Sequence, residues 1–287
     1  MDGTQGAIDT ANPARTPPAA DFGARRFGRV NWLGLWTLYA REVRRFLKVA
    51  FQTVLAPVIS TLLLLIVFTV AFAGNRPDIN GVPFISFLAP GLVMMAVLTN
   101  AFANSSSSLV IAKVQGSIVD VLMPPLSAAE LAVAIAAGAA TRGLLVGFVT
   151  ALTSAGFMAA GGDPMGVENL FAILYFSFAA AAIFGMLGLI GGIWADKFDQ
   201  LAAVTNFAIT PLTFLSGTFY SVNVLPEPFR TVSHANPVYY LIDGFRSGFT
   251  GVAESDLRVG VAVTLGLMIA LGAACYALLK AGYKIKE

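Results

Sequence analysis

One stretch of sequence decides the fold class. Residues 169–195 read NLFAILYFSFAAAAIFGMLGLIGGIWA and contain no charged side chain. About 20 consecutive apolar residues cross the hydrocarbon core of a bilayer as a helix, and this stretch is longer than that. It lacks the period-two alternation that is typical of a lipid-facing barrel strand. The stretch therefore predicts a membrane-spanning helix.

The composition indicates that this helix is one of several. The chain has 287 residues, of which 57% are apolar and only 12% are charged, whereas a typical soluble domain is about 25% charged. So few charges could not cover the surface of a soluble enzyme, and a single Cys cannot form an internal disulfide. Six charge-free stretches predict an all-α polytopic membrane protein with six transmembrane helices, at about 52–74, 86–108, 131–158, 169–194, 202–220 and 258–281.

The positions of Lys and Arg predict the orientation, because short cytoplasmic flanks are enriched in these residues. The flanks of the outermost spans carry Arg15, Arg25, Arg26, Arg29, Arg41, Arg44, Arg45, Lys48, Lys280, Lys284 and Lys286. The opposite loops hold Arg76, Arg230, Arg246 and Arg258. We therefore expect a multi-pass protein with both termini in the cytoplasm. The net charge of +2 is too small to suggest nucleic-acid binding.

Three segments outside the spans have distinct patterns. Residues 1–30 are rich in Pro, Gly and Ala, which predicts a disordered cytoplasmic tail ahead of the six-helix domain at 49–287. Residues 31–48 have apolar and basic positions at helical spacing, which predicts an amphipathic interfacial helix, although a plain positive-inside anchor is the alternative. The segment 221–257 mixes aromatic, apolar and charged residues, as outer re-entrant helices do.

The first cytoplasmic loop predicts a short helix at 113–123 that Pro124 and Pro125 stop. It is either a connector or a docking surface for a cytoplasmic partner, and periodicity does not decide between them. Within the third span, Arg142 either reaches the cytoplasmic interface or faces inward and meets an anionic head group or an interhelical acceptor. In the outer segment, Asp243 and Arg246 form an i,i+3 pair of opposite charge.

Several chemistries are disfavoured by the sequence. No Gly-Lys pair occurs, so a phosphate-binding loop of the G-x-x-x-x-G-K-[ST] type is absent and any ATPase is another polypeptide. Carboxylates are missing from the span centres, which argues against secondary transport. Ser216 and His234 are expected to be a packing residue and a surface residue rather than a catalytic pair. One His and one Cys argue against a metal site, and Cys275 is expected to pack as a small apolar residue.

Two motifs resemble those of the type-2 permeases of bacterial ATP-binding-cassette exporters. The first is FLSGTFY at 214–220, followed by Leu-Pro at 225–226, NPVY at 236–239 and DGFR at 243–246. The second is QGSIVDVLMPPLS at 115–127, in which Gln115 replaces an acidic residue of the family pattern. The resemblance covers about residues 30 to 285 and is strongest to permeases related to nodulation-factor, polysaccharide and drug exporters.

The resemblance implies a permease subunit of the bacterial inner membrane that moves an amphipathic substrate outward, such as a lipid, a glycolipid or polysaccharide, or a drug. It implies a homodimer among membrane lipids, with a separate ABC ATPase that holds ATP and Mg, and no enzymatic activity or cofactor on this chain. A six-span channel or secondary carrier and a membrane-embedded enzyme are the alternatives. The residues implied in ATPase coupling are Gln115, Gly116, Ser117, Asp120, Leu122, Arg41, Arg44 and Arg45. Those implied in the outer gate are Phe219, Tyr220, Asn236, Pro237, Tyr239, Asp243 and Arg246.

Overall fold

The computed structural model describes residues 30–72, 78–79, 81–162 and 164–284. The tail expected at 1–30 lies outside the described residues except for Val30. Residues from Asn31 onward form one compact unit. Its elements are α1 (Trp32–Leu47), α2 (Ala50–Ala71), β1 (Asp78–Ile79), β2 (Val82–Pro83), α3 (Phe84–Val114), α4 (Ile118–Leu122), α5 (Ala128–Ala160), α6 (Leu170–Trp194), α7 (Phe198–Val204), η1 (Thr205–Ile209), α8 (Thr210–Leu215), η2 (Val222–Val224), α9 (Phe229–Ala235), α10 (Pro237–Thr250) and α11 (Leu257–Ala281).

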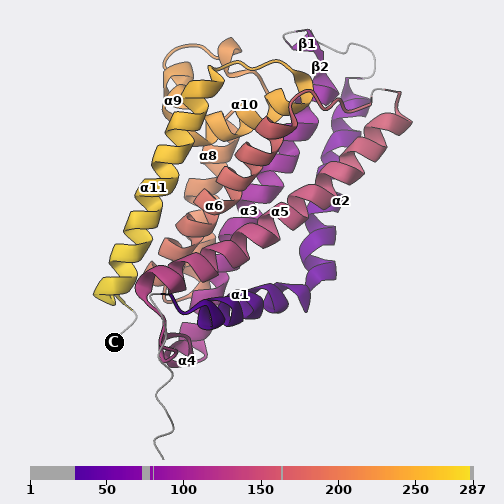
Figure 1. Cartoon of the computed structure of the whole chain (residues 1–287). Helices are drawn as coiled ribbons and strands as arrows, with labels where there is room; N and C mark the ends of the chain where they lie inside the picture. Colours follow the sequence, from indigo (N-terminus) through magenta and orange to yellow (C-terminus); the bar gives the residue numbers. More distant parts are fainter. Residues whose placement is uncertain (1–29, 73–77, 80, 163, 285–287) are drawn as a thin grey trace, which may run out of the picture. The chain divides into compact units, whose positions relative to one another are not determined.

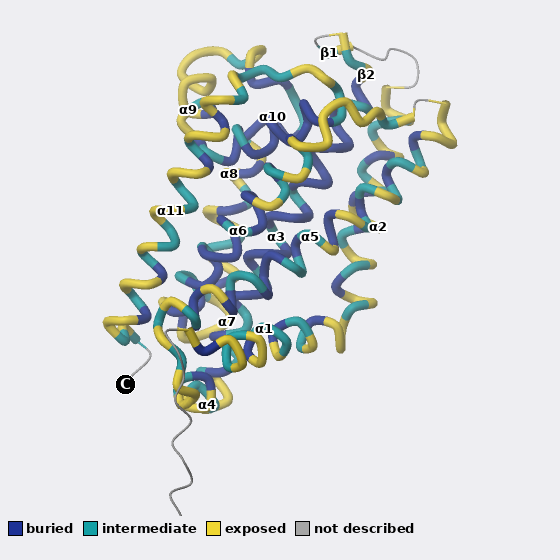
Figure 2. Tube along the Cα trace, viewed as in Figure 1, coloured by how far each residue is buried: buried dark blue, intermediate teal, exposed yellow. Residues whose placement is uncertain are grey.

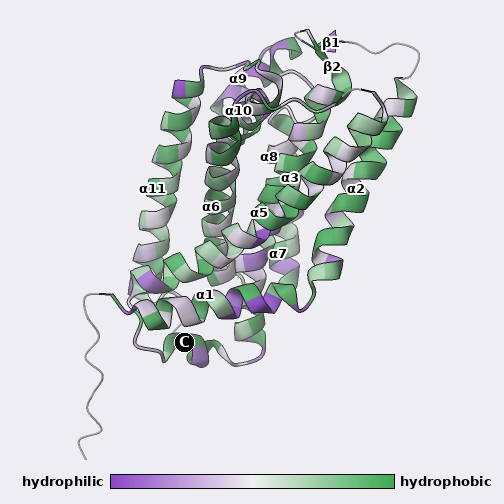
Figure 3. Ribbon diagram, turned by 45° about the vertical axis from the view of Figure 1, so that its right-hand side comes forward, coloured by the Kyte–Doolittle hydropathy of each residue, from purple (hydrophilic) through white to green (hydrophobic). Residues whose placement is uncertain are grey.

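The prediction of an all-α polytopic membrane protein is confirmed. Five helices within the described residues, α2, α3, α5, α6 and α11, are long and apolar enough to cross a membrane. The strands β1 and β2 form only a two-residue antiparallel pair. Figure 3 shows that hydrophobic residues dominate the long helices, whereas hydrophilic residues gather on α1.

The segment expected as the fifth span differs from the prediction of one helix at 202–220. It consists of α7, the π-helical turn η1 and α8, which follow one another without a gap and end at Leu215. Pro211, in the first turn of α8, has no N–H to donate to the carbonyl of Phe207 four residues earlier. A π-helical turn at that place accommodates the missing hydrogen bond. Gly217, with a φ of 75° that favours glycine, lies in the turn after α8.

The unit has two ends, which we name by the short helices that mark them. At the α4 end lie α1, α4 and the last turn of α11, and at the α10 end lie α9, α10 and the strand pair (Figure 1). Lys113, near the end of α3, donates hydrogen bonds to the carbonyls of Ile193 and Ala195 at the end of α6. Arg246 of α10 joins the first turn of α3, at Phe87, to Gly217 after α8. The segment Phe198–Leu215 therefore runs from the α4 end to the α10 end.

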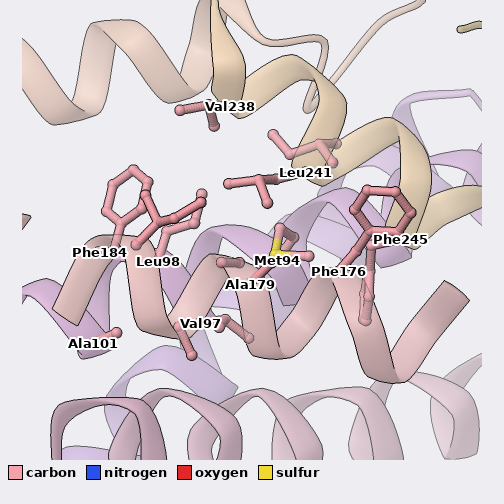
Figure 4. Close-up of a cluster of buried hydrophobic side chains, with 14 of the residues drawn as sticks. Met94, Val97, Leu98, Ala101, Phe176, Ala179, Phe184, Val238, Leu241 and Phe245 are labelled. Carbon is pink, nitrogen blue, oxygen red and sulfur yellow. The ribbon is translucent and has the colours of Figure 1, made fainter. Parts of the chain in front are cut away.

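Helix α3 is the centre of the unit. In the most apolar part of each helix, 78% of the residues of α3 are buried, against 17% in α2 and 11% in α11, and this contrast is visible in Figure 2. The hydroxyl of Ser105 on α3 donates a 2.7 Å hydrogen bond to the carbonyl of Gly185 on α6. Figure 4 shows the apolar core that α3, α6 and α10 share, with Met94, Phe176 and Leu241 among its members. The packed α3–α6–α10 core therefore lies between the elements at the two ends.

Candidate functional site

The loop at the α4 end protrudes from the bundle. Helix α3 continues to Val114, and Gly116 makes a turn with a φ of 69°, so α4 covers only Ile118–Leu122 rather than the predicted 113–123. Gln115, Gly116 and Asp120 are exposed, while Ser117 and Leu122 are half-buried. Two apolar side chains, Val119 and Met123, are also exposed beside them. The predicted coupling residues of this loop therefore share an accessible surface with an apolar component.

This loop is fastened to the starts of α1 and α5. Asn31, which caps α1 by accepting a hydrogen bond from the N–H of Gly34, also donates from Nδ2 to the carbonyl of Pro125 at 3.2 Å. Glu130 accepts hydrogen bonds from the backbone N–H groups of Asn31 and Ser127, and Ser127 caps α5. The loop and the first turns of the two helices consequently form one block.

The basic residues of α1 do not all face outward. Arg41 and Arg44 are exposed, as a coupling surface requires. Arg45, which we expected on the same surface, instead turns toward α3, where its Nη2 donates to the carbonyl oxygen and to Oδ1 of Asn104. The same guanidinium lies 3.1 Å from Oε2 of Glu42. Arg45 turns inward because Glu42, three residues earlier on the inner face of α1, attracts its guanidinium, whereas Arg44 points away from this carboxylate.

Glu42 is a residue of this region that the sequence patterns did not single out. It is only 2% exposed, and its Oε1 accepts a 2.9 Å hydrogen bond from the hydroxyl of Ser108 on α3. A Cβ placed on Gly138 of α5 would lie 2.6 Å from the Cβ of Glu42, so the two helices can approach this closely only at a glycine. A signal was present, because Glu42 falls on the apolar face of α1, at helical spacing from Leu38 and Phe46.

Arg142 extends this buried polar region to α5. It is half-buried, and its Nη2 donates a 3.2 Å hydrogen bond to Oδ1 of Asn100 on α3, so the interhelical acceptor is the alternative that the structure supports. At the preceding residue, the hydroxyl of Thr141 on α5 lies 3.0 Å from the hydroxyl of Tyr39 on α1. We call the whole set the α1 polar cluster; its members are Tyr39, Glu42, Arg45, Asn100, Asn104, Ser108, Thr141 and Arg142.

At the α10 end, Arg246 holds three elements together. It is 2% exposed, its Nε donates to the carbonyl of Phe87 at 3.0 Å, and its Nη2 donates to the carbonyl of Gly217 at 2.6 Å. The guanidinium carbon also lies 3.6 Å from the centre of the Phe87 ring, a cation–π contact. Gly91 permits the approach, since a Cβ there would lie 2.5 Å from the carbonyl oxygen of Thr218. Helix α10, the start of α3 and the end of α8 are thereby locked to one another.

The expected pairing of Asp243 with Arg246 is wrong. Asp243 accepts hydrogen bonds from the N–H groups of Glu254 and Ser255 at 3.0 and 2.9 Å, and from the Ser255 hydroxyl at 2.6 Å. Among the described residues no hydrogen bond or ion pair joins its carboxylate to Arg246. The reason is that each group finds better-aligned partners in another segment than across one helical turn. Asp243 therefore fixes the loop before α11, while Arg246 fixes the helix ends.

The other predicted outer-gate residues surround the start of α10. Asn236 caps α10 by accepting from Val238 N–H, and its Nδ2 donates to the carbonyl of Leu212 and to the hydroxyl of Ser216. Pro237 is the first residue of α10, and the buried Tyr239 packs edge-on against His234. Phe219 contacts the rings of Phe68 and Phe214, and Tyr220 is half-buried next to it.

Neither a catalytic pair nor a metal centre is apparent in the part of the chain that the structure describes. The Ser216 hydroxyl is hydrogen-bonded to Asn236 and to the carbonyl of Leu212, whereas the ring of His234 packs edge-on against Tyr239. No group of three or more His, Cys, Asp or Glu side chains within the described ranges is placed to hold a metal ion. Cys275 is buried and its thiol donates to the carbonyl of Met186.

An ion-pair group ties the C-terminal end of α11 to the bundle. Asp196, just after α6, lies 3.2 Å from Nζ of Lys284 and 3.5 Å from Nζ of Lys113. The hydrogen bond from Lys284 is the main reason that the pKa of Asp196 lies below its ordinary value. Because Asp196 is solvent-exposed, these ion pairs fix the position of the C-terminal end of α11 but add little to the stability of the fold.

Comparisons with known proteins agree with these observations. The model of the family described as "ABC-2 type transporter" matches residues 34–250, from α1 to the end of α10. The chain is 34% identical over 256 residues to the inner membrane transport permease YadH of Escherichia coli K12, covering 89% of this chain and 98% of that protein. It is 27% identical over 241 residues to nodulation protein J of Rhizobium leguminosarum bv. viciae, covering 82% and 88%. The resemblance to type-2 permeases is confirmed, and the chain belongs to the ABC-2 type transporter family.

Proposed function

We propose that this chain is the membrane subunit of an ATP-driven exporter, which carries an amphipathic lipid, glycolipid or polysaccharide, or drug out across the bacterial inner membrane. Two copies would work with two copies of a separate ABC ATPase, which binds ATP and Mg²⁺, and this chain would hold no cofactor. The observation that carries the proposal is the exposed α4 loop, which is anchored to α1 and α5 rather than hanging free. An anchored loop can transmit a displacement by a cytoplasmic partner to the spanning helices.

We further propose six crossings with both termini in the cytoplasm. The segment Phe198–Leu215 supports a sixth crossing because it connects the two ends of the unit. Its 18 residues would extend about 27 Å as helix, close to the ~30 Å of a hydrocarbon core. With an even number of crossings, the basic flanks before α2 and after α11 share the cytoplasmic side.

The coupling surface would consist of the α4 loop and the outer face of α1. Gln115, Gly116, Ser117, Asp120 and Leu122 would contact the ATPase together with the exposed Arg41 and Arg44. Arg45 would act one step further in, because it belongs to the α1 polar cluster. Displacing α1 alone would separate the buried Glu42 from Ser108, which is unfavourable in a low-dielectric environment, so α1 is expected to move with α3 and α5.

The outer gate would be built at the α10 end. Phe219, Tyr220, Asn236, Pro237 and Tyr239 would line or brace the junction of α8, α9 and α10, and Asp243 would hold the loop before α11. Arg246 would fasten this junction to α3. Because Arg246 bonds both α3 and Gly217, a shift of α3 at the cytoplasmic side would reach the exit through it.

Charge reversal at the loop tests the proposal. In the reconstituted permease–ATPase complex, Asp120→Lys should lower the amount of substrate exported per ATP while membrane insertion remains intact. Asp199→Lys is the matched control, since Asp199 is also an exposed carboxylate, in the first turn of α7. Unchanged coupling in Asp120→Lys would remove the loop from the ATPase interface.

The competing function is a six-span channel or secondary carrier. Reconstitution of the chain without any ATPase separates the two. If substrate then moved down an ion gradient at the rate of the full complex, the exporter proposal would be refuted. If transport instead requires the ATPase, a screen for compounds that stimulate the ATPase of the complex would identify the substrate class.

A further inference from the structure

One guanidinium of the α1 polar cluster has no carboxylate to balance its charge. Glu42 is the acidic member of the cluster, and both of its oxygens are engaged, since Oε2 lies 3.1 Å from Arg45 and Oε1 accepts from Ser108. Among the described residues, Arg142 makes one hydrogen bond, from Nη2 to the neutral amide of Asn100, and no ion pair. The cluster therefore holds two cations and one anion, so it carries one positive charge in excess.

The unmet hydrogen-bonding groups of the cluster are donors. Nε of Arg142 and Nδ2 of Asn104 are buried and have no partner within the described part of the chain. A guanidinium has five N–H groups and no acceptor, so the bond to Asn100 satisfies only one of them. Water can accept hydrogen bonds from such donors, but it cannot neutralise the excess charge. The group that completes this cluster is therefore an anion.

The guanidinium of Arg142 is open to a ligand on one side. Its Nη1 makes no hydrogen bond to a described residue and, unlike Nε, remains accessible. Leu145, three residues later and thus a neighbour on the surface of α5, is exposed and apolar. Because α5 is apolar enough to span a membrane, this side of the helix faces lipid. An anion can therefore approach Arg142 from the bilayer.

The position of Arg142 along α5 matches the level of the lipid head groups. Helix α5 begins at the α4 end and packs against Glu42 of α1 at Gly138. Arg142 comes one turn later, about 6 Å further along the helix axis. An amphipathic interfacial helix lies at the boundary between head groups and acyl chains, and the long side chain of an arginine beside it can reach this boundary. The anion at this level is the lipid phosphate, whose oxygens suit the planar fork of a guanidinium.

We propose that Arg142 binds the phosphate group of a phospholipid in the leaflet at the α4 end. The phosphate accepts hydrogen bonds from Nη1, and the single negative charge of a phosphodiester balances the excess charge of the cluster. Arg45 adds a second positive charge nearby, because its partner Asn104 lies one helical turn from Asn100 on α3. This binding does not depend on the exporter function.

Native mass spectrometry of the delipidated, full-length permease tests the site with three probes. Phosphatidylglycerol carries an anionic phosphodiester and two acyl chains, diacylglycerol has the chains without the phosphate, and inorganic phosphate has no chains. We expect phosphatidylglycerol to bind, and Arg142→Gln to weaken its tightest binding about ten-fold or more, because a hydrogen bond between charged groups is lost. Glutamine retains a donor for Asn100, so the contact between α5 and α3 can persist. Arg41→Gln is the control, since it removes an equal charge from the exposed face of α1.

A variant with the opposite expected effect separates loss of binding from loss of folding. Glu42→Gln raises the excess to two positive charges and should tighten the binding of phosphatidylglycerol about two-fold or more, which a misfolded protein could not do. Equal affinities in Arg142→Gln and Arg41→Gln, or weaker binding in Glu42→Gln, would overturn the proposal. Diacylglycerol that binds as tightly as phosphatidylglycerol would also overturn it, because the phosphate would then be irrelevant. Inorganic phosphate that binds Arg142 as tightly as the lipid does would identify a soluble anion as the occupant instead.

Discussion

Replacing Glu42 by alanine tests how α1 is attached to the bundle. The substitution removes the acceptor of the Ser108 hydrogen bond and the carboxylate that pairs with Arg45. Removing one partner of a fully buried ion pair costs about 3–5 kcal/mol. Arg45 is 27% exposed and keeps its bonds to Asn104, so we expect a smaller loss of about 2–3 kcal/mol in the free energy that docks α1.

Hydrogen exchange of the α1 amides measures this loss directly. A change of about 2–3 kcal/mol corresponds to a roughly 30- to 150-fold increase in the opening equilibrium. Glu42→Gln keeps an acceptor for Ser108 and should show a loss of only about 1 kcal/mol. Arg41→Ala is the control on the same helix, since the side chain of Arg41 is exposed.

If α1 exchanges at the same rate in Glu42→Ala and in Arg41→Ala, the α1 polar cluster does not hold the helix. A double-mutant cycle with Ser108→Ala adds a second criterion. Because Glu42 and Ser108 are in contact, their effects should not be additive.

Three further predictions concern other parts of the molecule. Arg246→Ala should lower export in transport assays and should destabilise the junction of α3 and α10 by about 3 kcal/mol in thermal unfolding. Arg246→Lys should not restore export, because an ammonium group lacks the planar fork that reaches two carbonyls. Gly138→Ala should destabilise the protein by about 1–3 kcal/mol through the clash with Glu42, whereas Gly156→Ala on the same helix, with open space around it, should be neutral or stabilising in thermal unfolding. The folded-state pKa of Asp196 is lowered, so its pairing with Lys284 should hold above the ordinary carboxyl pKa and be lost as the pH falls through the lowered value. Protease accessibility of the C-terminal end of α11 should therefore increase across this acidic range. A constant accessibility would contradict the pairing.

The locations of the long helices follow from the sequence because charge is excluded from the bilayer core. The predicted range 169–194 and helix α6 at Leu170–Trp194 differ by one residue at the start, and 258–281 compares with Leu257–Ala281 for α11. Helix α3 extends six residues beyond the predicted 86–108 and ends at Val114, just before the turn at Gly116. Local composition therefore indicates where the helices lie, but it does not always indicate where they stop, as α3 shows.

The contacts within the candidate sites could not be predicted in the same way. Arg246 bonds carbonyls of Phe87 and Gly217, which are 159 and 29 residues away in sequence, and backbone carbonyls leave no signature in side-chain patterns. The i,i+3 rule pointed to Asp243, the nearest opposite charge, because it considers one helix at a time. The buried role of Glu42 could have been predicted from the sequence, since a carboxylate on an apolar helix face needs a partner from another element.

The length of α3 has a consequence for how the two membrane faces communicate. At 31 residues it extends about 46 Å, well beyond the ~30 Å hydrocarbon core. This one helix bears Phe87 in its first turn, Asn104 and Ser108 in its last third and Lys113 next to its final residue. The contacts that hold α1, α6 and α10 are therefore all made to the same helix. A displacement applied at one face can thus arrive at the opposite face as rigid-body motion, without a relay of rearranging side chains.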